Sequence, residues 1–128
     1  MKTVLVVDDN DINRYLAVQV LEKGGFRVVQ ASSGAEALAA VADGPPDVMV
    51  LDIQMPGLSG FDVLARIRGS AQAAVARIPI LAATALAMAE DRERCLRLGA
   101  TGFLPRPFGM KELVTRVRAL AEAPDAGN

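Results

Sequence analysis

Histidine is absent from this chain of 128 residues. Without an imidazole the chain has no histidine general base, and it cannot build a Ser-His-Asp triad or a zinc site that contains histidine. The single cysteine, Cys95, cannot form an internal disulfide, and one thiol does not make a thiolate metal site. The chemistry left to the chain is that of oxygen ligands and carboxylates.

Long apolar runs and clusters of basic residues are also missing. No apolar run approaches the roughly 20 residues that a membrane-spanning helix needs, and the first residues lack the pattern of a signal peptide. The net charge is −1, and no block of Lys or Arg stands out. We therefore expect a cytoplasmic protein with no membrane insertion and no direct contact with nucleic acid.

Apolar residues make up 52% of the chain, which is enough for one domain with a proper core. We expect this domain to span residues 1–121 and residues 122–128 to form a flexible tail. Short β-branched runs alternate with helical patterns along the chain. The runs predict strands at Thr3–Val7, Phe26–Ala31, Asp47–Asp52, Ile78–Thr84 and Gly102–Pro105, and the patterns predict helices at 11–23, 34–41, after residue 59, at about 88–98 and at 110–121.

The predicted helices carry local signals of their own. Ser33 and Glu36 have the spacing of a capping box, and Ser59 can cap the helix that follows it. The first helix carries one apolar stripe, which we expect to face the core and which consists of Ile12, Leu16, Val20 and Leu21.

Five strands that alternate with five helices predict βαβ units with right-handed crossovers. The expected fold class is therefore α/β, with a five-stranded parallel sheet, helices on both faces and the doubly wound (βα)5 arrangement of flavodoxin-like folds. In such sheets ligands bind beyond the carboxyl ends of the strands, at the point where the strand order reverses.

Acidic side chains stand at the ends of two of these strands. Asp8 and Asp9 follow the first strand, and Asp52 ends the third. We expect them to converge at one edge of the sheet with Thr84, which ends the fourth strand, and Arg106, which follows the fifth. Converging carboxylates repel each other, and Mg²⁺, which prefers oxygen ligands, would neutralise them.

A metal ion next to an additional carboxylate suggests phosphoryl transfer. The Asp52 carboxylate is a candidate nucleophile that would form an acyl phosphate. Thr84 could donate a hydrogen bond to one phosphoryl oxygen, and the cation of Arg106 could pair with another.

At these residues the sequence resembles a response-regulator receiver domain, the phosphoacceptor module of two-component signalling. The resemblance covers essentially the whole chain. The length suggests a stand-alone receiver, but VDDNDINRYL is also similar to receivers attached to hybrid kinases, so an excised domain remains an alternative. The motifs that carry the resemblance are VDDN at Val7–Asn10, PDVMVLDIQMPGLSG at Pro46–Gly60, Thr84-Ala85, and GFLPRPF at Gly102–Phe108.

The resemblance implies a role for each acid. Asp52 corresponds to the phosphorylated aspartate. Asp9 and Asp52 correspond to direct ligands of Mg²⁺, or of Mn²⁺ in its place, with the main-chain carbonyl of Gln54 as a third ligand. Asp8 corresponds to the acid that holds the metal through water.

The resemblance also implies a switch. Thr84 corresponds to the switch hydroxyl and Phe103 to the switch aromatic, and the family commonly has a cis peptide bond at the position before Pro107. Arg106 departs from the pattern, because the family has lysine there. A planar guanidinium differs from a compact ammonium, so our hypothesis is that Arg106 still reaches the phosphoryl group while switching is retuned.

The chain has no histidine of its own, and the family implies that a sensor histidine kinase or a histidine phosphotransfer protein is the phosphodonor. The resemblance places the docking site of this donor near Ile12–Tyr15. It also implies a downstream protein that binds the face formed by the helix at 88–98, the strand at 102–105 and the helix at 110–121. The domain is then a phosphoacceptor and not an enzyme, beyond its own autophosphorylation and autodephosphorylation.

Three other functions are consistent with part of the sequence. A flavin mononucleotide binder shares the architecture but needs a phosphate-binding loop, and DDND would repel phosphate there. A phosphatase with an aspartyl nucleophile would carry a second acid where this chain has Gln54. A degenerate receiver that is not phosphorylated is favoured by Arg106 alone.

Overall fold

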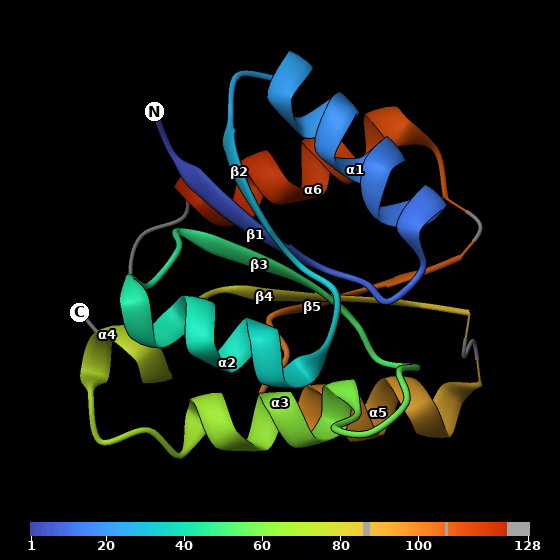
Figure 1. Ribbon diagram of the computed structural model, residues 1–128. Helices are drawn as coiled ribbons and strands as arrows, with labels where there is room; N and C mark the ends of the chain where they lie inside the picture. Colours follow the sequence, from blue (N-terminus) through green and yellow to red (C-terminus); the bar gives the residue numbers. More distant parts are fainter. Residues whose placement is uncertain (86–87, 107, 123–128) are drawn as a thin grey trace.

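The chain folds into alternating strands and helices around one parallel sheet (Figure 1). The computed structural model describes residues 1–85, 88–106 and 108–122. The strands are β1 (Thr3–Val7), β2 (Arg27–Ala31), β3 (Val48–Asp52), β4 (Ile80–Thr84) and β5 (Gly102–Pro105). The helices are α1 (Asp11–Lys23), α2 (Gly34–Asp43), α3 (Gly60–Arg68), α4 (Ala73–Ala76), α5 (Ala89–Arg97) and α6 (Met110–Glu122).

The strand order is β2-β1-β3-β4-β5, and every neighbouring pair is parallel. The chain moves from β1 outward to β2 and then crosses back to β3 on the other side of β1. The order therefore reverses between β1 and β3, which is where a doubly wound sheet binds its ligand. The predicted fold class is confirmed.

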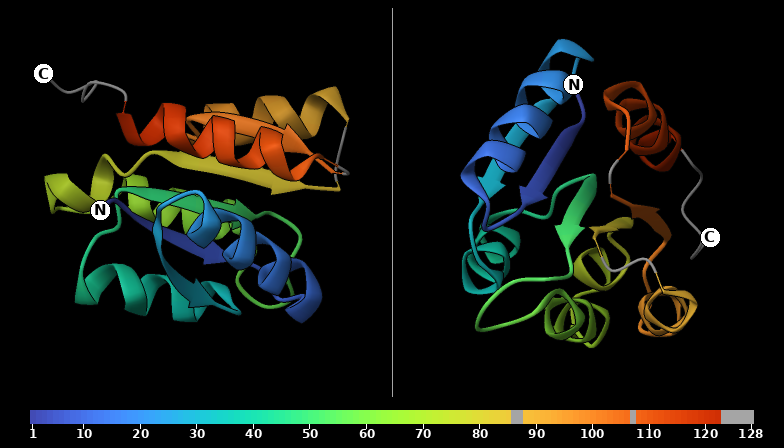
Figure 2. Two further views of the ribbon diagram at one scale, coloured as in Figure 1. Left: turned by 90° about the horizontal axis from the view of Figure 1, so that it is seen from above. Right: turned by 90° about the vertical axis from the view of Figure 1, so that its right-hand side faces the viewer.

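Helices cover both faces of the sheet. Figures 1 and 2 show α1 and α6 on one face and α2, α3 and α5 on the other. Each face has its own apolar core, because side chains of one strand alternate between them: Val4 and Val6 point to the α1 and α6 side, and Leu5 and Val7 to the opposite side. None of the helices in the described residues is long and apolar enough to cross a membrane.

Most predicted elements agree with the structure within two residues, and two local differences have clear causes. Strand β4 begins at Ile80 and not at Ile78, because Pro79 has no N–H to donate to the ladder. The one-turn helix α4 was not predicted, because four residues are too few for a helical pattern. The predicted tail lies outside the described residues except for Glu122, which is the last residue of α6.

The predicted capping box at Ser33 is half correct. The Ser33 hydroxyl accepts a hydrogen bond from the Glu36 N–H at 3.1 Å, as a cap should. The Glu36 carboxylate, however, accepts hydrogen bonds from the N–H and the hydroxyl of Ser32, both at 2.9 Å, instead of from the N–H of Ser33. The complete capping box is at the start of α3, between Ser59 and Asp62.

The predicted buried stripe of α1 is wrong at its first turns. Ile12 is 72% exposed and Leu16 is 46% exposed, whereas Val18 and Leu21 are buried. Leu16 lies instead on the wall of a mostly apolar cavity of about 360 Å³ between α1 and α6. We call this cavity the α1–α6 groove. Helices α1 and α6 leave this groove open between them, so the apolar side chains of the first turns of α1 stay exposed in spite of their spacing.

Arg68 ties together the end of the sheet that lies opposite the strand carboxyl ends. It is the last residue of α3, and its guanidinium donates to the carbonyls of Gly99 at 2.8 Å, Ala76 at 2.9 Å and Ile78 at 2.7 Å. Gly99 has φ +107° and lies so close that a Cβ there would come within 2.7 Å of the Arg68 side chain. One side chain thus joins α3, α4, the segment that leads into β4 and the turn after α5.

We predict that Arg68→Met lowers the free energy of unfolding by about 3 kcal/mol, because three carbonyls lose a charged donor. Urea unfolding followed by circular dichroism measures the effect. Arg66→Met is the matched control, since Arg66 is exposed on the same helix, and it should change stability by less than about 0.5 kcal/mol. Equal effects of the two substitutions would contradict the role of Arg68.

Candidate functional site

The loop after β1 presents two adjacent acids in different environments. The Asp8 side chain is buried, and its Oδ1 accepts a hydrogen bond from the Asn10 N–H at 2.9 Å. Asp9 is exposed. Asn10 then caps α1, because its side chain accepts a hydrogen bond from the Asn13 N–H at 2.9 Å. A strand end, a tight loop and a helix cap therefore fix where the two carboxylates lie.

Asp52 reaches the same edge from β3. Its side chain is buried, and its Oδ1 accepts a hydrogen bond from the Gln54 N–H at 3.0 Å. The loop returns closely to the strand, since the Gly60 N–H donates to the Ile53 carbonyl at 3.0 Å. A Cβ at Gly60 would lie 2.5 Å from the Cα of Ile53, so only glycine allows this approach. The loop therefore holds Asp52 in place.

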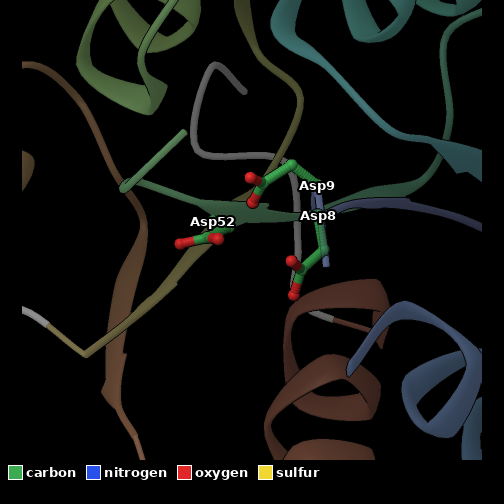
Figure 3. Close-up of side chains that lie close together, drawn as sticks. All are labelled: Asp8, Asp9 and Asp52. Carbon is green, nitrogen blue, oxygen red and sulfur yellow. The ribbon is translucent and has the colours of Figure 1, made fainter. Parts of the chain in front are cut away.

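Figure 3 shows the carboxylates of Asp8, Asp9 and Asp52 gathered at the ends of β1 and β3. One oxygen of each lies within 4.8 Å of the others, so the three could hold a metal ion together. Every donor is a carboxylate oxygen, which suits a hard cation such as Mg²⁺. The exposed Asp9 also leaves the cluster open to a hydrated ion. The residues present thus fit the predicted cation.

Burial and like charge act together on Asp52. The pKa of Asp52 is raised from 3.8 to about 6, mainly by burial and further by the charges of Asp8 and Asp9. The hydrogen bond from Gln54 and the charge of Arg106 oppose it. The Asp52 carboxylate is therefore costly to ionise in the folded protein, as expected where negative charge is concentrated.

Arg106 supplies the positive charge nearest to the acids. Its Nη2 lies 2.6 Å from Asp8 Oδ2, and its Nη1 lies 4.0 Å from Asp52 Oδ2. The backbone fixes where this side chain starts, because the Arg106 N–H donates to the Thr84 carbonyl at 2.8 Å. The guanidinium therefore links the end of β5 to acids from β1 and β3.

The other predicted site residues lie at different distances from the acids. Thr84 ends β4 and is fully buried, one position beyond Ala83, which is the partner of Asp52 in the β3–β4 register. Phe103 pairs in register with Ala82, so it lies further from the edge and packs partly buried against the α2, α3 and α5 core. The side chain of Gln54 is exposed. Pro107, with its predicted cis bond, lies outside the described residues.

Arg14 is a part of the site that the sequence did not predict. Its guanidinium donates to the main-chain carbonyl of Asp8 at 2.8 Å, to Asp11 at 2.6 Å and to the side chain of Gln30 at 3.2 Å. It thereby ties the loop with Asp8 and Asp9 to β2. The only signal in the sequence was the i,i+3 spacing of Asp11 and Arg14, which is common on helix surfaces.

The raised pKa of Asp52 predicts a dependence of stability on pH. The folded protein keeps a proton on Asp52 that the unfolded chain releases from about pH 4, so stability falls as the pH rises to about 6. Asp52→Asn cannot ionise. We predict that its stability relative to wild type improves by up to about 3 kcal/mol between pH 4 and pH 7.

Urea unfolding in the presence of a chelator at several pH values measures this difference. Asp43→Asn, at an exposed carboxylate, is the matched control and should show no comparable trend. A stability difference between Asp52→Asn and wild type that stays constant with pH would contradict the assignment.

Comparisons with known proteins agree on one family. The chain matches the model of the response regulator receiver domain over residues 4–118. It is 40% identical over 120 residues to the transcriptional regulatory protein KdpE of Mycobacterium tuberculosis, covering 93% of this chain and 50% of KdpE. It is 39% identical over 117 residues to the response regulator MprA of the same organism, covering 91% of this chain and 49% of MprA. The chain thus spans about half the length of these curated relatives.

Solved structures give the same result. The chemotaxis protein CheY4 of Vibrio cholerae superposes with a TM-score of 0.87 at 32% sequence identity, over 94% of this chain and 98% of that one. The family match extends over β1 to α6 and includes all three acids of the cluster. By its sequence, its fold and the acids at the point where its strand order reverses, the chain belongs to the response regulator receiver domains of two-component systems.

Proposed function

We propose that this domain accepts a phosphoryl group on Asp52 from the phosphohistidine of a sensor histidine kinase or a histidine phosphotransfer protein. The observation that supports this proposal most directly is the buried Asp52 carboxylate with Asp8, Asp9 and Arg106 around it. The family to which the chain belongs acts in two-component signalling. The donor histidine lies outside this chain, because the chain contains no histidine.

Asp52 is the nucleophile in this proposal. Its Oδ1 is held by the Gln54 N–H, whereas its Oδ2 faces Arg106. A carboxylate oxygen forms the bond to phosphorus while the bond between phosphorus and the donor imidazole breaks, and the electron pair leaves with that nitrogen. The product is an acyl phosphate on Asp52. Transfer requires the ionised carboxylate, so the groups that lower the pKa of Asp52 favour it.

Mg²⁺ is the proposed cofactor, and Mn²⁺ could replace it. Asp9, Asp52 and the main-chain carbonyl of Gln54 would hold it directly, and Asp8 would hold it through water. When bound, the ion neutralises charge on the phosphoryl oxygens. Arg106 provides a second positive charge within the chain, at hydrogen-bonding distance from Asp8.

Thr84, Phe103 and Arg106 are the proposed switch residues. The Thr84 hydroxyl would donate to a phosphoryl oxygen, and its backbone is already joined to Arg106. Phe103 packs partly buried next to α5, so a change at Thr84 would reach the face formed by α5, β5 and α6. Phosphorylation then shifts the population between two packings of this face, where a downstream protein binds.

The proposed docking site for the phosphodonor is the start of α1. Ile12 and Tyr15 are 72% and 61% exposed, beside the edge that carries the acids. The proposed location is the cytoplasm. The domain is a phosphoacceptor with its own autophosphorylation and autodephosphorylation chemistry and not an enzyme for other substrates. A degenerate receiver gains no support from the matches to KdpE, MprA and CheY4.

We predict that wild-type protein gains the mass of one phosphoryl group when mixed with acetyl phosphate and Mg²⁺. Asp52→Asn should gain none, because it lacks the nucleophile, and the exposed control Asp43→Asn should behave as wild type. Intact-mass spectrometry measures the product. Wild-type protein that gains no phosphoryl mass would contradict the proposed function.

We also predict that Thr84→Ala takes up the phosphoryl group but loses the response of the α5, β5 and α6 face. In NMR spectra with Mg²⁺ and beryllofluoride, wild type should show shifts on this face that Thr84→Ala lacks. Thr115→Ala, an exposed threonine on α6, is the matched control. Full shifts in Thr84→Ala would rule out Thr84 as the switch hydroxyl.

A further inference from the structure

The ion pair between Arg106 and Asp8 occupies an acid that the proposed divalent cation would also need. Asp8 is only 2% exposed, and the guanidinium lies 2.6 Å from its Oδ2. Its other oxygen, Oδ1, accepts a hydrogen bond from the Asn10 N–H. Both oxygens of Asp8 are therefore engaged by groups of the chain itself.

The guanidinium is placed to serve two acids at once. While Nη2 contacts Asp8, Nη1 of the same group lies 4.0 Å from Asp52 Oδ2. A planar fork can face two carboxylates in this way, whereas an ammonium is a single point of charge. Asp9, the third acid of the cluster, is the exposed one. The positive charge thus covers the two buried acids.

The same carboxylates are those that would bind a divalent ion. A cation among oxygens that lie within 4.8 Å of one another would be close to the guanidinium, and two positive charges at that distance repel each other. It would also compete for the charge and the lone pairs of Asp8 Oδ2.

The Arg106 guanidinium lies beside an aromatic ring and a groove that could accommodate it away from Asp8. It lies 5.8 Å from the centre of the Phe108 ring, and both residues line the α1–α6 groove. An arginine can rest on an aromatic face while its charge stays near solvent. The side chain is 23% exposed, so rotation toward the groove does not require the core to open.

We propose that Arg106 is an internal counter-ion that competes with the divalent cation for Asp8 and thereby weakens metal binding. This inference rests on the proposed function, which supplies the metal site, and it adds a residue that sets the affinity of that site. In the absence of metal the guanidinium stabilises the buried acids. Binding of the cation then requires the Arg106–Asp8 pair to separate.

Isothermal titration calorimetry with MgCl₂ tests the proposal on four proteins: wild type, Arg106→Met, Asp8→Asn and the double variant. We expect Arg106→Met to bind Mg²⁺ about tenfold more tightly than wild type, because the competitor is gone. In the Asp8→Asn background the same change should tighten binding by less than about threefold, since the contact is already absent. Lys111→Met, which removes an exposed charge on α6, should bind Mg²⁺ as wild type does.

Two results would overturn the proposal. Unchanged or weaker binding by Arg106→Met would show that Arg106 does not compete with the cation. An equal gain with and without Asp8 would show a general effect of charge and not competition for Asp8. Arg106→Lys, which keeps a charge, is the second variant should Arg106→Met fold poorly as judged by circular dichroism, and it should tighten binding by about threefold.

The test separates this inference from the proposed function. Absence of Mg²⁺ binding in wild type and in every variant would contradict the metal site itself, and the counter-ion role would fall with it. Binding by wild type that is lost in Asp52→Asn, together with unchanged affinity in Arg106→Met, would leave the phosphoacceptor function intact and overturn only the role of Arg106.

Discussion

Negative charge that is buried at the edge of the sheet needs positive charge beside it, and the arrangement of this site follows from that requirement. Asp8 and Asp52 are almost completely buried, yet a buried carboxylate is costly unless it is paired or protonated. The chain meets part of the cost with Arg106, which approaches both acids from the end of β5. The remainder appears as the raised pKa of Asp52. Such an incompletely neutralised site attracts a cation.

The fold brings this charge together from distant parts of the sequence. Asp8 and Arg106 are 98 positions apart, and they meet only because parallel strands end at the same edge of the sheet. The reversal of strand order between β1 and β3 places Asp8 and Asp52 on neighbouring strands. Local interactions complete the arrangement, since the cap at Asn10 and the close approach at Gly60 hold the two loops. The apolar cores on the two faces support the site without taking part in it.

The sequence determined the topology and the meeting of the acids, because both depend on patterns that repeat along the chain. The bounds of β1, α1 and β5 were predicted to the residue. The exposure of Ile12 and Leu16 was not predicted, since it depends on how far α6 lies from α1 and no spacing within one helix reports that distance. The contact between Glu36 and Ser32 and the contacts of Arg14 were not predicted. For Arg106 the sequence predicted the position beside the acids but not the pairing with Asp8. In each case several partners were within reach of a flexible side chain, and the tertiary arrangement selected among them. The functional roles assigned to Thr84, Phe103 and Gln54 remain predictions.

The hydrogen bonds of Arg68 bear on how helix α5 can move. This helix starts beyond β4, on the side of the acids, and runs to a turn whose Gly99 carbonyl is held by Arg68. Its far end is thus fastened to α3 and to the segment that leads into β4. With nine residues, α5 is about 13 Å long, so its two ends lie well apart. The contacts of Arg68 therefore restrain the Gly99 end of α5 directly, whereas its other end, on the side of the acids, is not held by them.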